Sequence, residues 1–141
     1  MEPEHVAQIA QLERLCFSSP WSEASVASEL SNPLALWLVA LDGDMVAGYI
    51  GAQTVVGESD MMNVAVDPQY RRQGVGRMLV ETLIQALREQ GSACLTLEVR
   101  ASNDAAIALY HQLEFSQVGC RKNYYRAPRE DALILRREIG E

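Results

Sequence analysis

The fold of this chain is decided by the segment Asn63-Val64-Ala65-Val66-Asp67-Pro68-Gln69-Tyr70-Arg71-Arg72-Gln73-Gly74-Val75-Gly76-Arg77. An apolar strand leads through a turn into a basic loop with two glycines, and the loop opens a helix. The first N–H groups of a helix have no partner within it, and glycine lets them approach an anion closely. The arginines add matching positive charge. The segment therefore predicts a phosphate-binding loop, with a pyrophosphate on the amides of residues 73–77.

Two nucleotide-binding motifs do not fit this loop. A P-loop requires Gly-Lys followed by Ser or Thr, whereas Gly76 is followed by Arg77 and Met78. A Rossmann fingerprint requires a third glycine three residues after the second, and Leu79 stands there. The alternative without function is a solvated pair of arginines ahead of an ordinary helix, because Gly-x-Gly alone is a common pattern.

The composition predicts one domain that spans residues 1–141, because 141 residues with 48% hydrophobic content can bury a substantial core. The longest apolar run, residues 34–41, is far shorter than a membrane span, and the acidic start of the chain is unlike a signal peptide. Three widely spaced cysteines, Cys16, Cys94 and Cys120, predict reduced thiols and neither a disulfide framework nor a zinc site. Together these features predict a cytoplasmic protein without a membrane partner.

The charge differs between the two halves of the chain. Residues 1–70 contain ten acidic residues and one basic residue, a net charge of −9, whereas residues 71–141 contain eleven basic and nine acidic residues, a net charge of +2. This asymmetry predicts an anionic cofactor on the second half and a cationic partner facing the first. The alternative is that the charges only keep the protein soluble. The overall acidity argues against direct binding of nucleic acid.

Periodicity and capping residues predict alternating helices and strands. Helices are expected at about 4–16, from Ser22 to about Leu30, from Val75 to just before Gly91, and from Asn103 to Leu113. Strands are expected at 34–41, 45–56, 61–66, 94–99, 116–121 and 132–138. The first three strands should be antiparallel neighbours, and the strand–helix–strand unit over residues 61–99 should form a right-handed parallel crossover.

From the glycine loop onwards the chain resembles the GNAT acetyltransferase superfamily, in which an Arg/Gln-x-x-Gly-x-Gly/Ala loop binds the pyrophosphate of acetyl-CoA. Residues 71–76 fit this pattern. Within that superfamily the chain is most similar to the RimI-type enzymes, which acetylate the N-terminal alanine of a small-subunit ribosomal protein. The segments that carry the resemblance span nearly the whole chain: Phe17-Ser18-Ser19-Pro20-Trp21-Ser22, residues 63–77, residues 97–110, Asn123-Tyr124-Tyr125 and Glu130-Asp131-Ala132.

The resemblance implies the α/β fold of the GNAT enzymes, a mixed and mostly antiparallel sheet flanked by helices. Members usually open with a strand, whereas here a helical pattern begins almost at once after Met1, so the first strand should be short or missing. Acetyl-CoA is the implied co-substrate, and no metal is implied. The implied cofactor-binding residues are Val64, Ala65, Val66, Arg71, Arg72, Gln73, Gly74, Val75, Gly76, Arg77 and Asn103.

Glu98 is the candidate general base, because acetyl transfer from a thioester requires the accepting amine to be neutral. Strand alternation places Glu98 on the polar face of its strand, together with Thr96. The alternative is a solvated glutamate near a strand end. RimI-type enzymes use the glutamate of the matching Leu-Glu-Val-Arg-Ala-Ser-Asn segment as the base, and the resemblance carries that role over to Glu98.

Tyr110 is the candidate general acid for the departing thiolate. It lies two helical turns beyond Asn103, so the two residues should share a helix face and lie about 10 Å apart along the axis. An aromatic core contact is the alternative role. In the superfamily, the tyrosine of the matching Asn-x-x-Ala-x-x-Leu-Tyr segment is the acid, and its asparagine contacts the cofactor.

Tyr124, Tyr125 and Glu130 are the candidate substrate-binding residues. Neighbours in an extended segment point to opposite sides, so the two tyrosines cannot both enter the core. The matching Tyr-Tyr element helps to shape the peptide site in RimI-type and related N-terminal acetyltransferases, and Glu130 would lie near it. Packing alone would also explain either tyrosine.

The sequence therefore predicts an enzyme, an acetyl-CoA-dependent N-acetyltransferase that modifies the α-amine of an N-terminal alanine by direct transfer. The expected partner is a protein or peptide N-terminus with basic residues, such as that of a ribosomal protein. Two alternatives stay open. One is a GNAT enzyme that acetylates a lysine side chain or a small-molecule amine, and the other is a non-catalytic module that senses acetyl-CoA.

Overall fold

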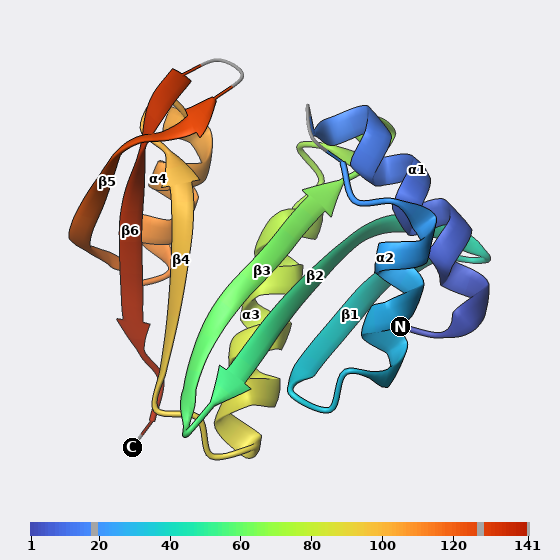
Figure 1. The fold of residues 1–141 in the computed structure, drawn as a ribbon, viewed down its shortest axis with the longest axis horizontal. Helices are drawn as coiled ribbons and strands as arrows, with labels where there is room; N and C mark the ends of the chain where they lie inside the picture. Colours follow the sequence, from blue (N-terminus) through green and yellow to red (C-terminus); the bar gives the residue numbers. More distant parts are fainter. Residues whose placement is uncertain (18–19, 127–128, 141) are drawn as a thin grey trace.

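A computed structural model describes residues 1–17, 20–126 and 129–140, so Ser18 and Ser19 of the first resembling segment lie outside the described residues. Six strands form one sheet in the order β1-β2-β3-β4-β6-β5 (Figure 1). Strands β3 and β4 pair in parallel, and the other neighbours pair antiparallel. The expectation of a mixed and mostly antiparallel sheet flanked by helices is confirmed.

The observed elements follow the expected order. The strands are β1 (Ala35–Asp42), β2 (Met45–Val55), β3 (Glu58–Val66), β4 (Cys94–Arg100), β5 (Ser116–Arg126) and β6 (Arg129–Glu138). The helices are α1 (Val6–Cys16), α2 (Glu23–Ser28), α3 (Val75–Glu89) and α4 (Asp104–Gln112), with 3-10 turns η1 (Pro3–His5), η2 (Glu29–Ser31) and η3 (Pro68–Tyr70). Among the described residues no strand precedes α1, so the strand expected to be short or missing is missing here.

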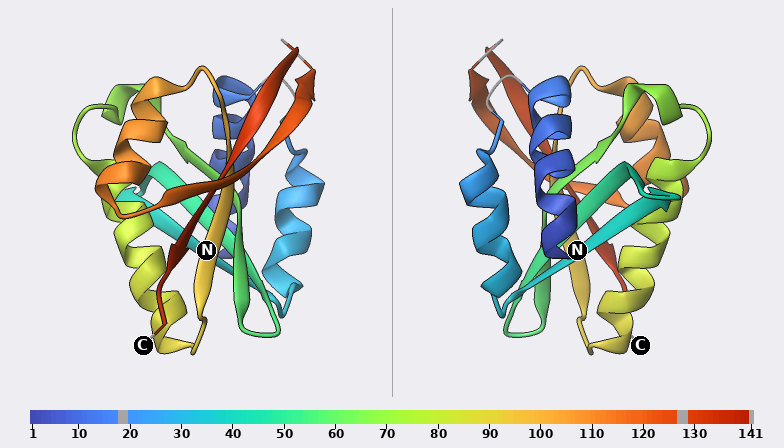
Figure 2. Two further views of the ribbon diagram at one scale, coloured as in Figure 1. Left: turned by 90° about the vertical axis from the view of Figure 1, so that its left-hand side faces the viewer. Right: turned by 90° about the vertical axis from the view of Figure 1, so that its right-hand side faces the viewer.

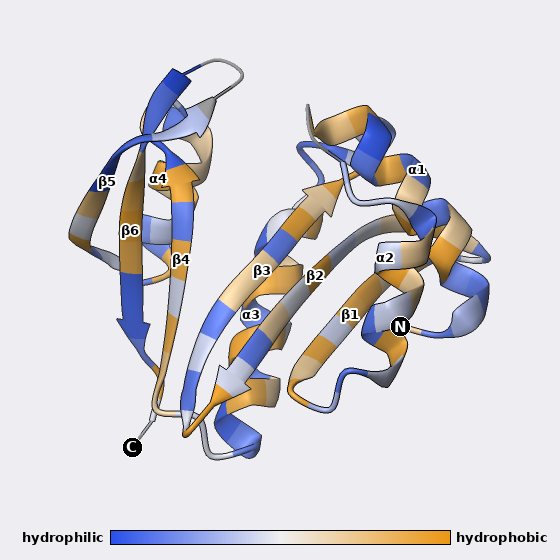
Figure 3. Ribbon diagram, viewed as in Figure 1, coloured by the Kyte–Doolittle hydropathy of each residue, from blue (hydrophilic) through white to orange (hydrophobic). Residues whose placement is uncertain are grey.

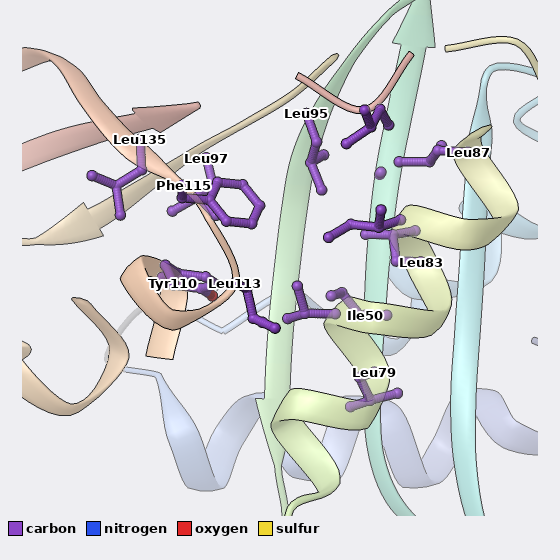
Figure 4. Close-up of a cluster of buried hydrophobic side chains, with 14 of the residues drawn as sticks. Ile50, Leu79, Leu83, Leu87, Leu95, Leu97, Tyr110, Leu113, Phe115 and Leu135 are labelled. Carbon is purple, nitrogen blue, oxygen red and sulfur yellow. The ribbon is translucent and has the colours of Figure 1, made fainter. Parts of the chain in front are cut away.

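Helices cover both faces of the sheet, with α1 and α2 on one face and α3 and α4 on the other (Figure 2). The α3 face holds the larger core, in which Leu79, Leu83 and Leu87 of α3 point towards Ile50 and Leu95 (Figure 4). These side chains are at most 3% exposed. These leucines follow one another at intervals of four residues, so they form the apolar stripe by which α3 contacts the sheet.

Local sequence signals fix the helix starts. The Ser22 side chain accepts a hydrogen bond from the Ser25 amide at the start of α2, and the Asn103 side chain accepts one from the Ala106 amide at the start of α4. Both caps agree with the sequence prediction. Along β4, polar and apolar residues alternate (Figure 3), and the apolar ones are buried in the core on the α3 face.

The last two strands extend further towards each other than their alternation indicated. Strand β5 ends at Arg126 and β6 begins at Arg129. The register of this pair shifts between Arg121 and Tyr125, and Asn123 between them has a φ of +53°. Such an irregularity breaks the period of two on which strand prediction depends, and this is why the predicted ends at 121 and 132 were wrong.

The sheet is forked between its two central strands. Residues 58–60 of β3 pair with residues 94–96 of β4, and the pairing ends there. Beyond this point the two strands diverge (Figure 1). We call the region between residues 61–66 of β3 and residues 97–100 of β4 the fork. Each strand keeps its other neighbour along the fork, because β2 pairs with β3 up to Val66 and β6 pairs with β4 up to Arg100.

A bulge lies in β3 where the fork opens. Ala52 of β2 faces Met61 and Gly51 faces Asn63, so Met62 is one extra residue in β3. A bulge bends its strand and reverses which side chains point to which face. The bend therefore directs β3 away from β4.

The closed end of the fork is held by buried hydroxyl groups. The Ser59 hydroxyl lies 2.7 Å from that of Thr54 on β2 and 2.7 Å from that of Ser92, which precedes β4. Ser59 and Ser92 are at most 2% exposed. This chain of contacts links β2, β3 and the start of β4 at the point where β3 and β4 are still paired.

Candidate active site

The first turn of α3 presents amide groups that have no partner in the helix. Met78 is the first residue whose amide bonds back along the chain, to the carbonyl of Gly74 at 3.0 Å. The amides of Val75, Gly76 and Arg77 donate no hydrogen bond to any residue that the structure describes. These groups, together with the positive end of the helix dipole, form an anion-binding position.

The two glycines of the loop are suited to a ligand rather than to internal packing. Gly74 caps α3 with a φ of +80°, and a Cβ atom added there would meet nothing within 4 Å. A Cβ atom added at Gly76 would make one ordinary contact, at 3.7 Å from Val66. Arg72 is left-handed as well, with a φ of +64°. Strained backbone of this kind is concentrated at ligand sites, and the open space is where a phosphate would approach.

The loop arginines do not all converge on the helix start. Arg71 donates to the sulfur of Cys16 on α1 at 3.7 Å. Arg77 donates to Gln112 on α4 at 3.1 Å and lies 3.4 Å from Glu81 one turn along its own helix. The side chains of residues 71 and 77 thus tie the loop to its surroundings, while the backbone amide of Arg77 stays at the helix start.

The strand before the loop offers its backbone rather than its side chains. Ala65 is buried in the core beneath α1, and Val64 and Val66 pack against the core beneath α3. Because these side chains are used in packing, any contact of residues 64–66 with a cofactor in the fork would be made by main-chain groups.

Tyr110 reaches from α4 to the point where the fork begins. Its hydroxyl lies 3.9 Å from the sulfur of Met61, the first residue of β3 after the pairing with β4 ends. The side chain is largely buried, with the Phe115 ring packed edge-on at 5.5 Å (Figure 4). Burial raises the pKa of Tyr110 to about 12, with a smaller contribution from Tyr125. The phenol therefore keeps its proton at neutral pH and is available as a donor.

Glu98 lies two residues beyond the last paired residue of β4, on the face of the sheet opposite α3. Its carboxylate is 3.0 Å from Nε of Arg121, and the Tyr124 hydroxyl donates a hydrogen bond to it. The Glu98 charge is also felt by Asp60, where burial is the main cause of a raised pKa and the charges of Glu58 and Glu98 add to it. The fork thus has a carboxylate on one strand and the Tyr110 phenol opposite the other.

The predicted acceptor residues lie on the hairpin of β5 and β6. Tyr124 is 49% exposed and Tyr125 is half-buried, so the two rings divide between solvent and protein as strand geometry requires. The Arg100 guanidinium stacks on Tyr125 at 4.2 Å and lies 3.4 Å from Glu130. Burial is the main cause that raises the pKa of Tyr125, and the nearby charge of Glu98 is the second. Tyr125 is therefore within electrostatic range of both Glu98 and Tyr110.

Two residues of this region were not found by the sequence analysis. Arg121 was not predicted to reach Glu98, because the two residues are brought together by the pairing of β5 with β6 and of β6 with β4, which is a tertiary feature. Glu13 is 1% exposed beneath β2 and β3. The burial of Glu13 could have been predicted from the sequence. Residue 13 falls on the same helical stripe as Ile9 and Cys16, and a carboxylate is unusual on an apolar stripe.

The family follows from the loop and the fork together. A model of the acetyltransferase (GNAT) family matches residues 6–115, which contain both features. The chain belongs to this family. As a GNAT protein it is an acetyl-CoA-dependent N-acetyltransferase.

Relatives of this GNAT chain agree in sequence and in structure. The [ribosomal protein bS18]-alanine N-acetyltransferase of Escherichia coli K12 is 45% identical over 126 residues, which are 88% of this chain and 84% of that protein. The crystal structure of the ribosomal-protein-S18-alanine N-acetyltransferase from Escherichia coli has a TM-score of 0.92 at 40% identity, covering 100% of this chain and 92% of that one. An aminoglycoside 6'-N-acetyltransferase complexed with coenzyme A shares the fold, with a TM-score of 0.82 at 18% identity over 98% of this chain and 92% of that one.

Among residues 1–17, 20–126 and 129–140, no group of three or more His, Cys, Asp and Glu side chains is placed to hold a metal ion. No helix there is long and apolar enough to cross a membrane.

Proposed function

We propose that this enzyme acetylates the N-terminal alanine of a ribosomal protein, in the cytoplasm, by direct transfer from acetyl-CoA. One observation carries the catalytic part: Glu98 and the Tyr110 hydroxyl both lie where β3 and β4 separate. The substrate class is supported by the E. coli relative at 45% identity, which is an N-acetyltransferase of the alanine of ribosomal protein bS18.

Glu98 acts as the general base on the attacking amine. An α-amine with a pKa of about 8 is roughly one-tenth neutral at pH 7, whereas a lysine amine at about 10.4 is only about one part in 2,500 neutral. An N-terminal amine therefore demands less of the base. Arg121 and Tyr124 both bond to the Glu98 carboxylate, so its direction is fixed before the substrate arrives.

Tyr110 acts on the leaving sulfur. The amine nitrogen bonds to the acetyl carbon, the carbon–sulfur bond breaks, and the thiolate receives a proton to leave as the thiol. A phenol with a pKa of about 12 is a weaker acid than a thiol at about 8.5, so complete transfer of its proton to a free thiolate is uphill. Tyr110 therefore donates a hydrogen bond to the developing thiolate and keeps its own proton. The amine gives its proton to Glu98, Glu98 releases it to solvent, and the thiolate takes up a proton from solvent to leave as the thiol.

The binding residues divide between the two substrates. The amides of residues 73–77 and the backbone of residues 64–66 hold acetyl-CoA, with Arg71, Arg72 and Asn103 beside it. The Asn103 oxygen already caps α4, so its amide NH₂ group is the part left for the cofactor. Tyr124, Tyr125 and Glu130 line the acceptor side. Residues 1–70 carry a net charge of −9, which favours an acceptor with basic residues after its alanine.

The proposal is tested with acetyl-CoA and three peptides followed by mass spectrometry. The first begins Ala and is rich in Arg, the second has its basic residues replaced by acidic ones, and the third is blocked at its N-terminus but keeps a lysine. We expect the first to be acetylated on its α-amine and the rate to fall as salt rises. Modification of the blocked peptide would establish lysine acetylation, and acetyl-CoA binding without any product would establish a sensing module. Equal rates on the first two peptides would remove the electrostatic argument.

A further inference from the structure

Glu13 of α1 is a buried carboxylate that the proposed chemistry does not use. It is 1% exposed and accepts hydrogen bonds from three parts of the chain. The Trp21 amide donates to one carboxylate oxygen at 2.9 Å. The other oxygen accepts from the Tyr49 hydroxyl on β2 and from the side-chain amide of Asn63 on β3. A buried carboxylate is costly unless it is fully bonded, and these donors account for both oxygens.

The partners of Glu13 are located at the opening of the fork. Asn63 directly follows the bulged residue Met62, and its own side-chain oxygen accepts a hydrogen bond from the Val64 amide at 3.1 Å. The Asn63 side chain therefore joins the Glu13 carboxylate to the backbone at the start of residues 64–66. Two residues earlier, Met61 is the contact of the Tyr110 hydroxyl.

This part of β3 lacks the support that strands usually have on both sides. Its pairing with β4 ends at Asp60, so β2 is its remaining strand neighbour. Helix α1 contributes further contacts, through Glu13 to Asn63 and through the sulfur of Cys16 to the Val66 carbonyl at 3.8 Å. The position of the unpaired half of β3 thus depends on contacts from α1.

The same carboxylate also fixes the segment between α1 and α2. Its bond to the Trp21 amide holds the chain just before α2, where the Trp21 ring packs edge-on against Trp37 at 5.7 Å. Trp37 in turn packs against Tyr49, with ring centroids 6.1 Å apart. One carboxylate therefore sets the distance between the α1–α2 segment and the bulge of β3.

We propose that Glu13 is a positioning residue for the acetyl transfer: acting through Asn63, it holds the bulged segment of β3 at the position that the reaction requires. The inference rests on the proposed function, because it concerns the same fork. Reacting groups must be aligned closely, and a displacement of about 1 Å can cost roughly 10²-fold in rate. Its role is separate from binding the pyrophosphate, which lies on the loop at the start of α3.

The test replaces Glu13 by glutamine, which keeps the shape of the side chain but presents an NH₂ group to donors. Glu29→Gln is the matched control. Glu29 is a second glutamate on the α1 side of the sheet. It accepts hydrogen bonds from the Trp37 indole at 3.2 Å and from the Asn32 side chain, and neither partner belongs to β3. We expect Glu13→Gln to lower kcat about 10- to 100-fold with the acetyl-CoA Kd within about threefold of wild type. Glu29→Gln should keep kcat within about threefold.

Two further variants show whether Glu13 acts through Asn63: Asn63→Ala alone, and the double variant that combines Glu13→Gln with Asn63→Ala. We expect Asn63→Ala to lower kcat by a similar factor and the double variant to be no slower than the slower single variant, because both changes remove one link. Additive losses, a wild-type kcat in Glu13→Gln, or an equal loss in Glu29→Gln would each overturn the inference. If Glu13→Gln fails to fold by circular dichroism, Asn63→Ala decides alone, and a wild-type kcat there overturns the inference.

Two choices separate this test from that of the proposed function. The rate is measured with whichever amine the wild-type enzyme acetylates, so a different acceptor class leaves the comparison intact. Hydrogen exchange of the Val64 amide, read by NMR, requires no activity at all. It should quicken in both Glu13→Gln and Asn63→Ala and stay unchanged in Glu29→Gln, and unchanged exchange in the first two variants would overturn the inference.

Discussion

The hydroxyl of Tyr124 donates a hydrogen bond to the carboxylate of Glu98, although β6 lies between their two strands. The small, fully buried Ala132 of β6 pairs with Arg100 on β4 and Arg121 on β5, which leaves room for side chains of the outer strands to meet across β6. The proposed base is therefore contacted from the hairpin that is proposed to bind the acceptor, so we expect peptide binding and base orientation to be coupled.

This contact can be measured directly. The bond to Glu98 is the main cause that raises the pKa of Tyr124, with the Glu98 charge second. In Glu98→Gln we expect the pKa of Tyr124 to move down towards the ordinary value of 10.0, because the charge that disfavours the phenolate is gone. An NMR titration of ring-labelled tyrosine would detect the change, and an unmoved Tyr124 resonance would mean that the contact is absent in solution.

Glu98→Gln should lower kcat by roughly 10² to 10⁴, the range for a lost general base. Activity should recover partly as pH rises, because a larger fraction of the amine is then neutral without help. Steady-state rates from pH 6 to 9 provide the measurement. The matched control is Asp60→Asn, a carboxylate close to Glu98 on the neighbouring strand, which should keep kcat within about threefold. Equal losses of kcat in both variants would show that the effect comes from the local negative charge and not from Glu98 as a base.

Tyr110→Phe should lower kcat by roughly 10² to 10⁴ while acetyl-CoA still binds, because the ring and its packing on Phe115 are kept. The same variant tests the pKa of about 12. In an ultraviolet titration, Tyr110→Phe should lack one tyrosine ionisation that wild type shows near that pH, and the ionisations near pH 10 should be the same in both proteins. Wild-type turnover in Tyr110→Phe would leave this tyrosine with a packing role only.

Gly74→Trp should weaken acetyl-CoA binding by at least tenfold, because a bulky side chain would occupy the open space at the start of α3 and strain a left-handed residue. Gly43→Trp is the matched control. Gly43 lies in the turn from β1 to β2 with a φ of +61° and equally open surroundings. Calorimetry on both variants separates backbone strain from a blocked site, and equal affinities for acetyl-CoA would refute the loop assignment.

Glu13 should make stability depend on pH. Burial is the main cause that raises the pKa of Glu13 above its ordinary value of 4.5, opposed by the bond from the Trp21 amide. The folded state then holds the proton more tightly than the unfolded state, so this stabilisation is full below pH 4.5 and is lost as pH rises through the folded pKa. Thermal melts should show wild type at its best relative to Glu13→Gln near pH 4 and at its worst near pH 8. A difference that stays constant with pH would contradict this.

The sequence predicted what is local and missed what depends on distant contacts. The caps at Ser22 and Asn103 and the start of α3 after the glycine loop are all encoded within one or two helical turns, so they could be predicted correctly. The fork could not, because the end of β3–β4 pairing at Asp60 and the bulge at Met62 depend on the packing of several elements.

The candidate site was predicted in part for the same reason. Glu98 and Tyr110 were proposed from their local motifs, and the structure adds that both lie at the fork. The contacts that position them come from other elements far along the chain, namely Arg121 beside Glu98, Met61 beside Tyr110, and Glu13 bonded to Asn63. Spacing within one helix or strand carries no information on such distances.

The hydroxyl chain of Thr54, Ser59 and Ser92 makes the fork behave as a lever. From Asp60 to Val66, β3 extends about 20 Å beyond the end of its pairing with β4, at about 3.3 Å per residue. A rotation of about 5° at Ser59 would therefore move the far end, the backbone of residues 64–66 that is proposed to hold acetyl-CoA, by roughly 1.7 Å, enough to displace the thioester from the reacting groups. The angle between β3 and β4 is set where the two strands are still paired, so these small hydroxyl side chains determine how far the strands separate at the cofactor end of the fork.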